Sequence, residues 1–290
     1  MAWPGAPRPR LVAISAARES WASQRSRLGM NPGRTAEGNL MWNQFVNAWS
    51  AYVGRPRFRG GNEAVVKAAP WIPAAGAVLG TAAGLAALLF IQMARGNAAA
   101  AGLLAAILVP GGLWWAQRGA GLNALVRAIR IAVQRFLDPE DVEGSLYWGI
   151  TATQAVLAVK IIATGLVVAN GGGLWLAVAP LIGAATYAHL LADAAGFQRE
   201  ATGEEKRMEI PVNWWIWGGA AVGVLVWTGL MQAPVSGVIA LLLCALAVRP
   251  MAQFAENAGL APAVRLRAVA EVNELVALLA GLFLTLLSAS

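Results

Sequence analysis

The sequence predicts an all-α fold: a polytopic integral membrane bundle of about seven transmembrane helices, with additional interfacial amphipathic helices. Two observations lead to this prediction. The 290 residues are 58% hydrophobic and only 13% charged, whereas soluble globular domains carry about a quarter charged residues. The apolar residues also run in blocks of roughly 20, the length an α-helix needs to cross about 30 Å of hydrocarbon.

The N-terminal part of the chain precedes the first apolar block. Residues 1–40 are rich in Arg, Ser, Pro and Gly and lack the continuous apolar core of a signal peptide. We expect a disordered basic tail here, or in part a misplaced start ahead of Met30 or Met41. The membrane domain is then predicted to be 41–290. Its first segment, "MWNQFVNAWSAYV" (41–53), places Trp and Tyr as an interfacial helix would.

Seven apolar segments are candidate spans. Two of them depart from the usual pattern of a span: one is short (234–248), and one carries two glutamates in its first turns (269–288). The segment "LNALVRAIRIAVQRFL" (122–137) is too charged to span and has its arginines apart from its apolar side chains, so we expect it to lie along the membrane surface. The candidate spans are 68–93, 97–117, 146–170, 172–192, 211–231, 234–248 and 269–288.

The basic residues predict the orientation. All but two of the 22 Lys and Arg, Arg95 and Lys160, lie in the N-terminal part of the chain through Lys67 or in 118–143, 193–210 and 249–268. The positive-inside rule then predicts a multi-pass inner (cytoplasmic) membrane protein with a cytoplasmic N-terminus and an external C-terminus. The net charge of +7 makes anionic membrane lipid an expected partner. Nucleic acid is not expected, since no RNA- or DNA-binding motif accompanies the arginines.

Lys160 lies deep in the third apolar segment, "AVLAVKIIATG". An ionisable side chain at that depth costs a few kcal/mol and normally faces a partner or a wet cavity. We therefore expect a buried, paired lysine; the alternative is a side chain that extends to the membrane interface. The single cysteine, Cys244, is predicted to be a small apolar filler.

Glu271 and Glu274 in "AVAEVNELVALLAGLF" share one helix face at spacing i, i+3. We expect the last helix to begin near Val269, which draws both carboxylates into the cytoplasmic leaflet. They could hold a cation or a polar substrate, or they could be an acidic helix N-terminus favoured by the macrodipole. Glu271, Glu274 and Lys160 are the candidate substrate-binding residues. No catalytic residue and no metal ligand is assigned.

The only histidine, His189, precedes Asp193 by four residues in "HLLADAAGF". Two groups at this spacing could supply ligands to a metal ion. We favour the simpler interpretation, in which they are polar residues at the membrane boundary that bond to each other.

From residue 41 to the end, the chain resembles the cobalamin synthase family (adenosylcobinamide-GDP ribazoletransferase). "MWNQFVNAWSAYVGRP" is similar to the family's opening helix and its Arg-Pro signature, and "VVKAAPWIPAAGAVLGTAAGLAALL" to its first span, with glycines at spacing four (Gly76, Gly80 and Gly84). "PGGLWW" falls where the family has a Gly-Gly pair, and Lys160 where members often have a lysine. "AVAEVNELVALLAGL" is similar to the closing helix.

The resemblance implies late cobamide nucleotide-loop assembly, in which a GDP-activated corrinoid is joined to α-ribazole with magnesium. The family holds its magnesium-binding acids after the Gly-Gly pair, whereas 111–130 contains no acid and no histidine. Trp114, Trp115 and Ala116 stand where the family has histidine, leucine and the first aspartate. The family's Ser-Arg-Gly and Gly-x-Thr-Gly-Asp signatures are also missing, near 180–186 and 255–266.

This pattern predicts a pseudoenzyme with weak or no transferase activity. Such a protein would act as a partner or scaffold for other cobamide-assembly proteins, or as a module that binds lipid or corrinoid intermediates. No cofactor is expected, and magnesium only if the transferase is active. The alternative is a divergent but active transferase that recruits Glu271, Glu274 and the acids of 138–143, which would otherwise be a solvated loop. The latter are Asp138, Glu140, Asp141 and Glu143.

Overall fold

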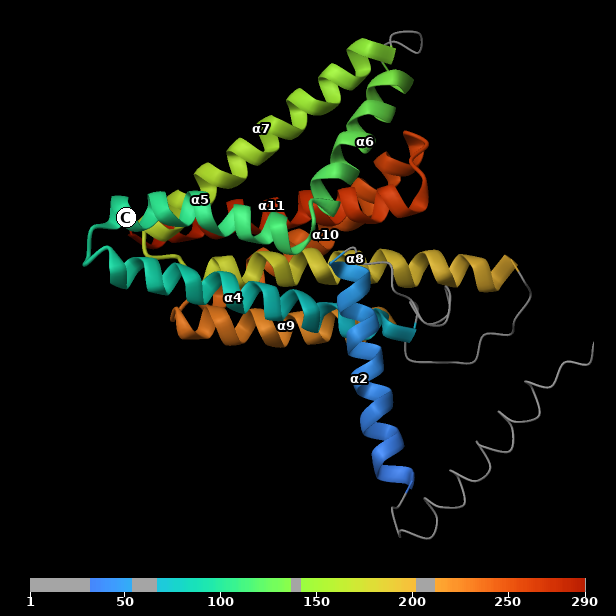
Figure 1. Cartoon of the computed structure of the whole chain (residues 1–290), viewed down its shortest axis with the longest axis horizontal. Coiled ribbons are helices and arrows are strands. Elements are labelled where there is room, and N and C mark those ends of the chain that lie inside the picture. Colours follow the sequence, from blue (N-terminus) through green and yellow to red (C-terminus); the bar gives the residue numbers. More distant parts are fainter. Residues whose placement is uncertain (1–31, 54–66, 137–141, 202–211, 290) are drawn as a thin grey trace, which may run out of the picture. The chain divides into compact units, whose positions relative to one another are not determined.

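The computed structural model describes residues 32–53, 67–136, 142–201 and 212–289 (Figure 1). Within these ranges the chain is α-helical and contains no strand, which confirms the all-α prediction. The helices are α2 (Pro32–Tyr52), α4 (Ile72–Met93), α5 (Ala98–Ala116), α6 (Ala120–Phe136), α7 (Val142–Ala169), α8 (Trp175–Ala201), α9 (Val212–Leu230), α10 (Pro234–Asn257) and α11 (Pro262–Ala289), with a 3-10 turn, η1 (Ala69–Trp71), before α4.

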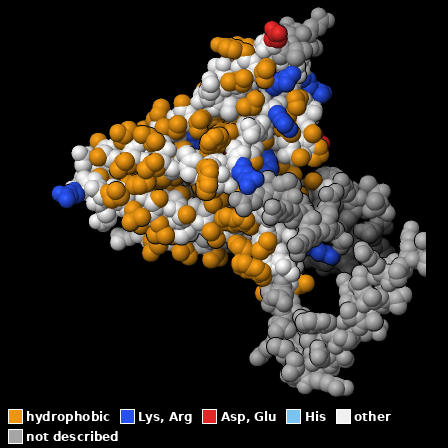
Figure 2. All heavy atoms as spheres, in the orientation of Figure 1, with side chains coloured by type: hydrophobic (Ala, Val, Ile, Leu, Met, Phe, Trp, Pro, Cys, Tyr) orange, Lys and Arg blue, Asp and Glu red, His pale blue; other side chains and the backbone are white. Residues whose placement is uncertain are grey.

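Among the described residues, six helical segments are long and apolar enough to cross a membrane, judged by length and composition: Ala69–Met93, Ala98–Ala116, Glu143–Ala169, Trp175–Ala194, Pro234–Asn257 and Pro262–Ser288. Hydrophobic side chains cover the visible faces of α4, α5 and α9 (Figure 2). The predicted count of seven is not confirmed, because α9 is absent from this set. Its 19 residues include Asn213, four Trp and four Gly, which lower its mean hydropathy although it coincides with the predicted span 211–231.

By its internal contacts the chain divides into two compact units, Met1–Asn43 and Gln44–Ser290. The predicted interfacial helix is present as α2, but it begins at Pro32 rather than at residue 41. Proline suits the first turn of a helix, where its missing N–H would have no partner. Residues 32–40, expected in the disordered tail, are therefore helical, and 1–31 lie outside the described residues.

Helix α8 is the centre of the second unit. Of the most apolar stretch of α8, 83% is buried inside the fold, against 22% of the corresponding stretch of α10. It packs along α4 and α11, and also against α9; α4 and α8 run side by side in Figure 1. The fully buried side chains Val178 and Ile182 of α8 belong to the main apolar core. A site formed by the face of α11 that contacts α8 therefore lies inside the bundle.

The glycines at spacing four let α4 approach α8 closely. A Cβ on Gly76 would lie 2.7 Å from the Pro180 carbonyl oxygen, and one on Gly84 would lie 3.2 Å from the Ala177 Cβ. A Cβ on Gly80 would meet the backbone of Ala177. The glycines at spacing four therefore form a stripe of small residues at a close helix contact.

Helix α6 is amphipathic, as its sequence predicts. Ala124, Leu125 and Ala128 are buried, whereas Arg127 is exposed. The buried face packs against α7 and α11. That α6 lies along a membrane surface remains a prediction.

Candidate functional site

Lys160 of α7 lies between the two glutamates of α11. Its Nζ is 2.9 Å from Glu271 Oε1 and 2.7 Å from Glu274 Oε1. All three residues are buried, with 8%, 6% and 2% of their surface exposed for Lys160, Glu271 and Glu274. The prediction of a buried, paired lysine is confirmed, and the alternative of an extended side chain is wrong. We call these three residues the ion-pair cluster.

The expected start of the last helix is wrong. Helix α11 begins at Pro262 and has no acid in its first turn, so Glu271 and Glu274 lie in its interior rather than at its N-terminus. The helix extends further because Arg265 and Arg267 find partners within the fold: Glu256 for Arg265, and the Ala51 and Tyr52 carbonyls for Arg267. The macrodipole alternative therefore does not apply to the two glutamates.

Two glycines leave space for the carboxylates. Gly121, in the first turn of α6, lies against the Glu271 carboxylate, and any side chain there would collide with it. A Cβ on Gly183 of α8 would lie 3.1 Å from the Cβ and 3.2 Å from Oε2 of Glu274. Each glutamate therefore points from α11 toward a neighbouring helix that has a glycine, and so no side chain, at that position.

The end of α2 joins the same region. Arg267 donates to the Ala51 oxygen at 2.6 Å and to the Tyr52 oxygen at 3.3 Å, and its guanidinium lies 5.4 Å from the centre of the Tyr187 ring. The Tyr52 hydroxyl donates to the Pro180 oxygen at 3.0 Å. Burial, and then the Glu274 and Glu271 carboxylates, raise the pKa of Tyr52 well above its usual value. The hydroxyl therefore remains a donor.

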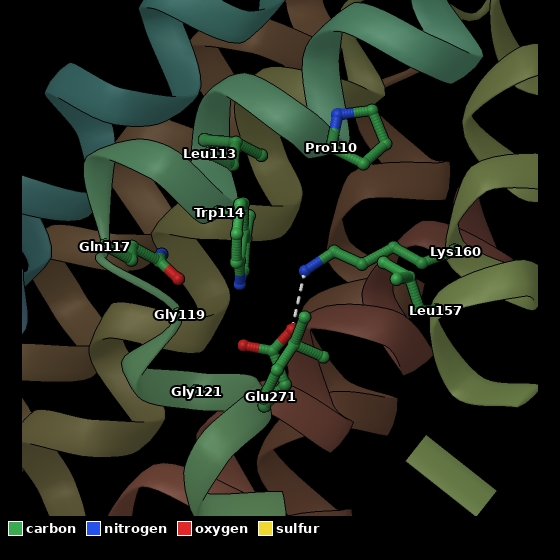
Figure 3. A pocket seen from close by; sticks show the side chains of 10 residues that line it. Pro110, Leu113, Trp114, Gln117, Gly119, Gly121, Leu157, Lys160 and Glu271 are labelled. Atoms are coloured by element: carbon green, nitrogen blue, oxygen red, sulfur yellow. Dashed lines mark hydrogen bonds and ion pairs between the residues drawn. The ribbon is translucent and has the colours of Figure 1, made fainter. Parts of the chain in front are cut away.

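The segment that follows the Gly-Gly pair faces the ion-pair cluster. A cavity of about 20 Å³ is lined by Trp114, Gln117 and Gly121 on one side and by Lys160 and Glu271 on the other. Figure 3 shows the Trp114 and Gln117 side chains pointing into this space and the contact between Lys160 and Glu271. A second cavity of the same size lies between Gln117, Tyr187, Arg267 and the glutamates. Each has room for about one water molecule.

His189 and Asp193 lie near each other but outside the ion-pair cluster. His189 Nε2 is 3.4 Å from Asp193 Oδ2, and Asn213 Nδ2 donates to Asp193 Oδ1 at 2.9 Å. The His189 ring also packs against Trp217, with 6.1 Å between ring centres. The predicted contact between the two residues is confirmed. No third ligand from the described part of the chain joins them to form a metal site.

The residues of the ion-pair cluster do not fit a magnesium ion that holds a diphosphate. Magnesium is bound by carboxylate oxygens together with water and substrate phosphates, but here one ammonium group contacts an oxygen of each carboxylate. Among the described residues no three His, Cys, Asp or Glu side chains come together. Of the acids that the alternative would recruit, Asp138, Glu140 and Asp141 lie outside the described residues, and Glu143 is exposed in the first turn of α7.

One buried polar contact was not anticipated. Asn273, between the two glutamates in sequence, donates to Thr186 Oγ1 of α8 at 2.6 Å and to the Cys244 oxygen of α10 at 3.2 Å. The signal was available in the sequence, since an amide in an apolar helix must find partners. The Cys244 side chain itself is free and fully buried, as predicted.

Searches against models of protein families, curated proteins and solved structures find no match for this chain.

Proposed function

We propose that this chain is a multi-pass membrane protein with the frame of the cobalamin synthase family and weak or no transferase activity. It acts as a partner, scaffold, or corrinoid- or lipid-binding module in late cobamide nucleotide-loop assembly. The observation that carries the proposal is the contact of Lys160 with both Glu271 and Glu274. These are the three charged residues that lie inside apolar segments where the chain is similar to the family, and here they pair with one another.

The charges around this contact argue against phosphoryl transfer. Transfer to or from a diphosphate relies on carboxylates that hold Mg²⁺ against the phosphate oxygens, because charge neutralisation and positioning supply most of the catalysis. The segment after the Gly-Gly pair lines the cavity with Trp114, Gln117, Gly119 and Gly121, none of which is an acid. The two glutamates on the opposite side are paired with a lysine. The cavity of about 20 Å³ also has no space for a nucleotide.

The first test is activity. We expect the purified protein, with Mg²⁺, to form neither cobalamin nor its 5′-phosphate from GDP-cobinamide and ribazole. We likewise expect it not to rescue a strain that lacks cobalamin synthase. An active member of the family, expressed to the same membrane level in that strain, is the control. Rescue at ordinary corrinoid concentrations would favour the divergent transferase instead, with substrate binding by Glu271, Glu274 and Lys160.

The second test is orientation. With α9 as a seventh span, the basic segments all fall on one face of the membrane, and we propose a cytoplasmic N-terminus and an external C-terminus in the inner membrane. Reporter fusions at Gly172, in the turn between α7 and α8, and at Ser290 are expected to give an external signal. A fusion at Gly259, between α10 and α11, is the cytoplasmic control. A cytoplasmic signal at both Gly172 and Ser290 would contradict the seven-span topology.

A further inference from the structure

A groove of about 490 Å³ lies between α6, α7, α10 and α11, and apolar side chains line it. Four of its lining residues are alanines, whose short side chains leave space: Ala128 and Ala132 from α6, Ala255 from α10 and Ala268 from α11. The volume lies in the range typical of ligand pockets, which is about 300–1,000 Å³. The groove is separate from the two small cavities at the ion-pair cluster.

One end of the groove is basic. There Phe136 stacks on Phe254, with 5.9 Å between ring centres. The exposed side chain of Arg135 places its guanidinium beside Gly259, just before Leu260, which lines the groove. Arg265 lies one helical turn before Ala268 on the same face of α11 and pairs with Glu256 at 3.0 Å. On the face seen in Figure 2, basic side chains gather over α6.

The groove has an apolar opening and a basic end, and these two features together identify its occupant. Helix α10 is the least buried of the six apolar segments, and it exposes Leu242, Leu246 and Phe254, so the groove opens onto a surface suited to lipid. A ligand that fills it needs an apolar chain and, at one end, an anion for an arginine. Arginine binds phosphate groups through directed hydrogen bonds.

We propose that the groove binds one anionic phospholipid, with an acyl chain along the alanines and the phosphate at Arg135. This rests on the lipid-binding part of the proposed function and deepens it, because it assigns a site and a headgroup charge; it is independent of transferase activity. A basic pocket between membrane helices is the form in which acidic headgroups are recognised. Phosphatidylcholine would also fill the space along the alanines, but its choline ammonium compensates its own phosphate, so Arg135 attracts it less.

Native mass spectrometry of the full chain in detergent tests the headgroup. The probes are dioleoyl phosphatidylglycerol and dioleoyl phosphatidylcholine, which differ in charge and not in acyl chains. We expect the phosphatidylglycerol to bind more tightly, and Arg135→Gln to weaken its binding about fivefold and that of phosphatidylcholine less. Arg95→Gln, in the exposed turn between α4 and α5, is the control and is expected to behave as the unaltered chain.

A second variant tests the groove itself. Ala132→Phe places a ring in the groove and is expected to reduce the binding of both lipids, whereas Ala82→Phe on the exposed face of α4 is expected to change neither. Equal binding of the two lipids, or retention of phosphatidylglycerol by Arg135→Gln, would overturn the proposal and leave the groove to another occupant such as a partner helix. Should Ala132→Phe fail to fold, the Arg135→Gln comparison still decides.

Discussion

Replacing Lys160 with methionine is expected to destabilise the bundle by roughly 3–5 kcal/mol, the usual cost of breaking a buried ion pair by removing one partner. Methionine keeps most of the side-chain volume, so the effect reports the lost charge rather than a cavity. Lys160 contacts both glutamates, at 2.9 and 2.7 Å, and its removal takes away the cation that contacts the two buried carboxylates. Thermal unfolding in detergent, followed by the fluorescence of the 13 tryptophans, measures the loss.

Two comparisons make the result specific to the buried cluster. Arg265→Met removes the cation of the Arg265–Glu256 pair, in which 19% of the arginine side chain and 70% of the glutamate side chain are exposed. Because solvent screens the glutamate, this pair is expected to contribute no more than about 1 kcal/mol. Glu274→Gln leaves Lys160 paired with Glu271, so it is expected to cost less than Lys160→Met. Equal, small losses for Lys160→Met and Arg265→Met would mean that the glutamates are ordinary surface acids.

The pairing of Lys160 with the glutamates could be anticipated because hydrocarbon makes unpaired charges costly. A lysine about ten residues from either end of an apolar segment needs a counter-ion, and Glu271 and Glu274 share a helix face. What the sequence could not supply was the start of α11. Arg265 and Arg267 are typical of the cytoplasmic flank of a span. In the structure, however, Arg267 donates to the Tyr52 oxygen at the end of α2, 215 residues away in the sequence.

Other features depend on contacts that no local pattern encodes. The spacing of Gly76, Gly80 and Gly84 predicts a close helix contact, but it does not identify α8 as the partner. The amphipathic pattern of α6 predicts its buried face without revealing that alanines from three helices leave a groove. The span count differs from the prediction for another reason: hydropathy scales rank Trp and Gly low, so α9, with four of each, is absent from the six apolar segments.

Gly80→Ala is expected to disrupt the contact of α4 with α8 and to destabilise the fold by about 1–3 kcal/mol or more, as overpacking of a tight interior does. The added Cβ would lie 2.9 Å from the Ala177 carbonyl carbon and 3.1 Å from its Cα. These are backbone atoms, which cannot rotate away as a flexible side chain could. Relief requires α4 to move off α8, the most buried helix of the six apolar segments.

The matched control is Gly218→Ala in α9, where a new Cβ would meet nothing within 4 Å. Alanine is favoured over glycine in a helix interior by about 1 kcal/mol, so this variant is expected to unfold at the same temperature as the unaltered chain or slightly higher. The two substitutions add the same methyl group in a helix, and they differ only in what that methyl group meets. A Gly80→Ala variant as stable as Gly218→Ala would show that α4 and α8 are not in close contact. A loss confined to Gly80→Ala would place the stripe of small residues at the interface that holds α8 in the centre of the bundle.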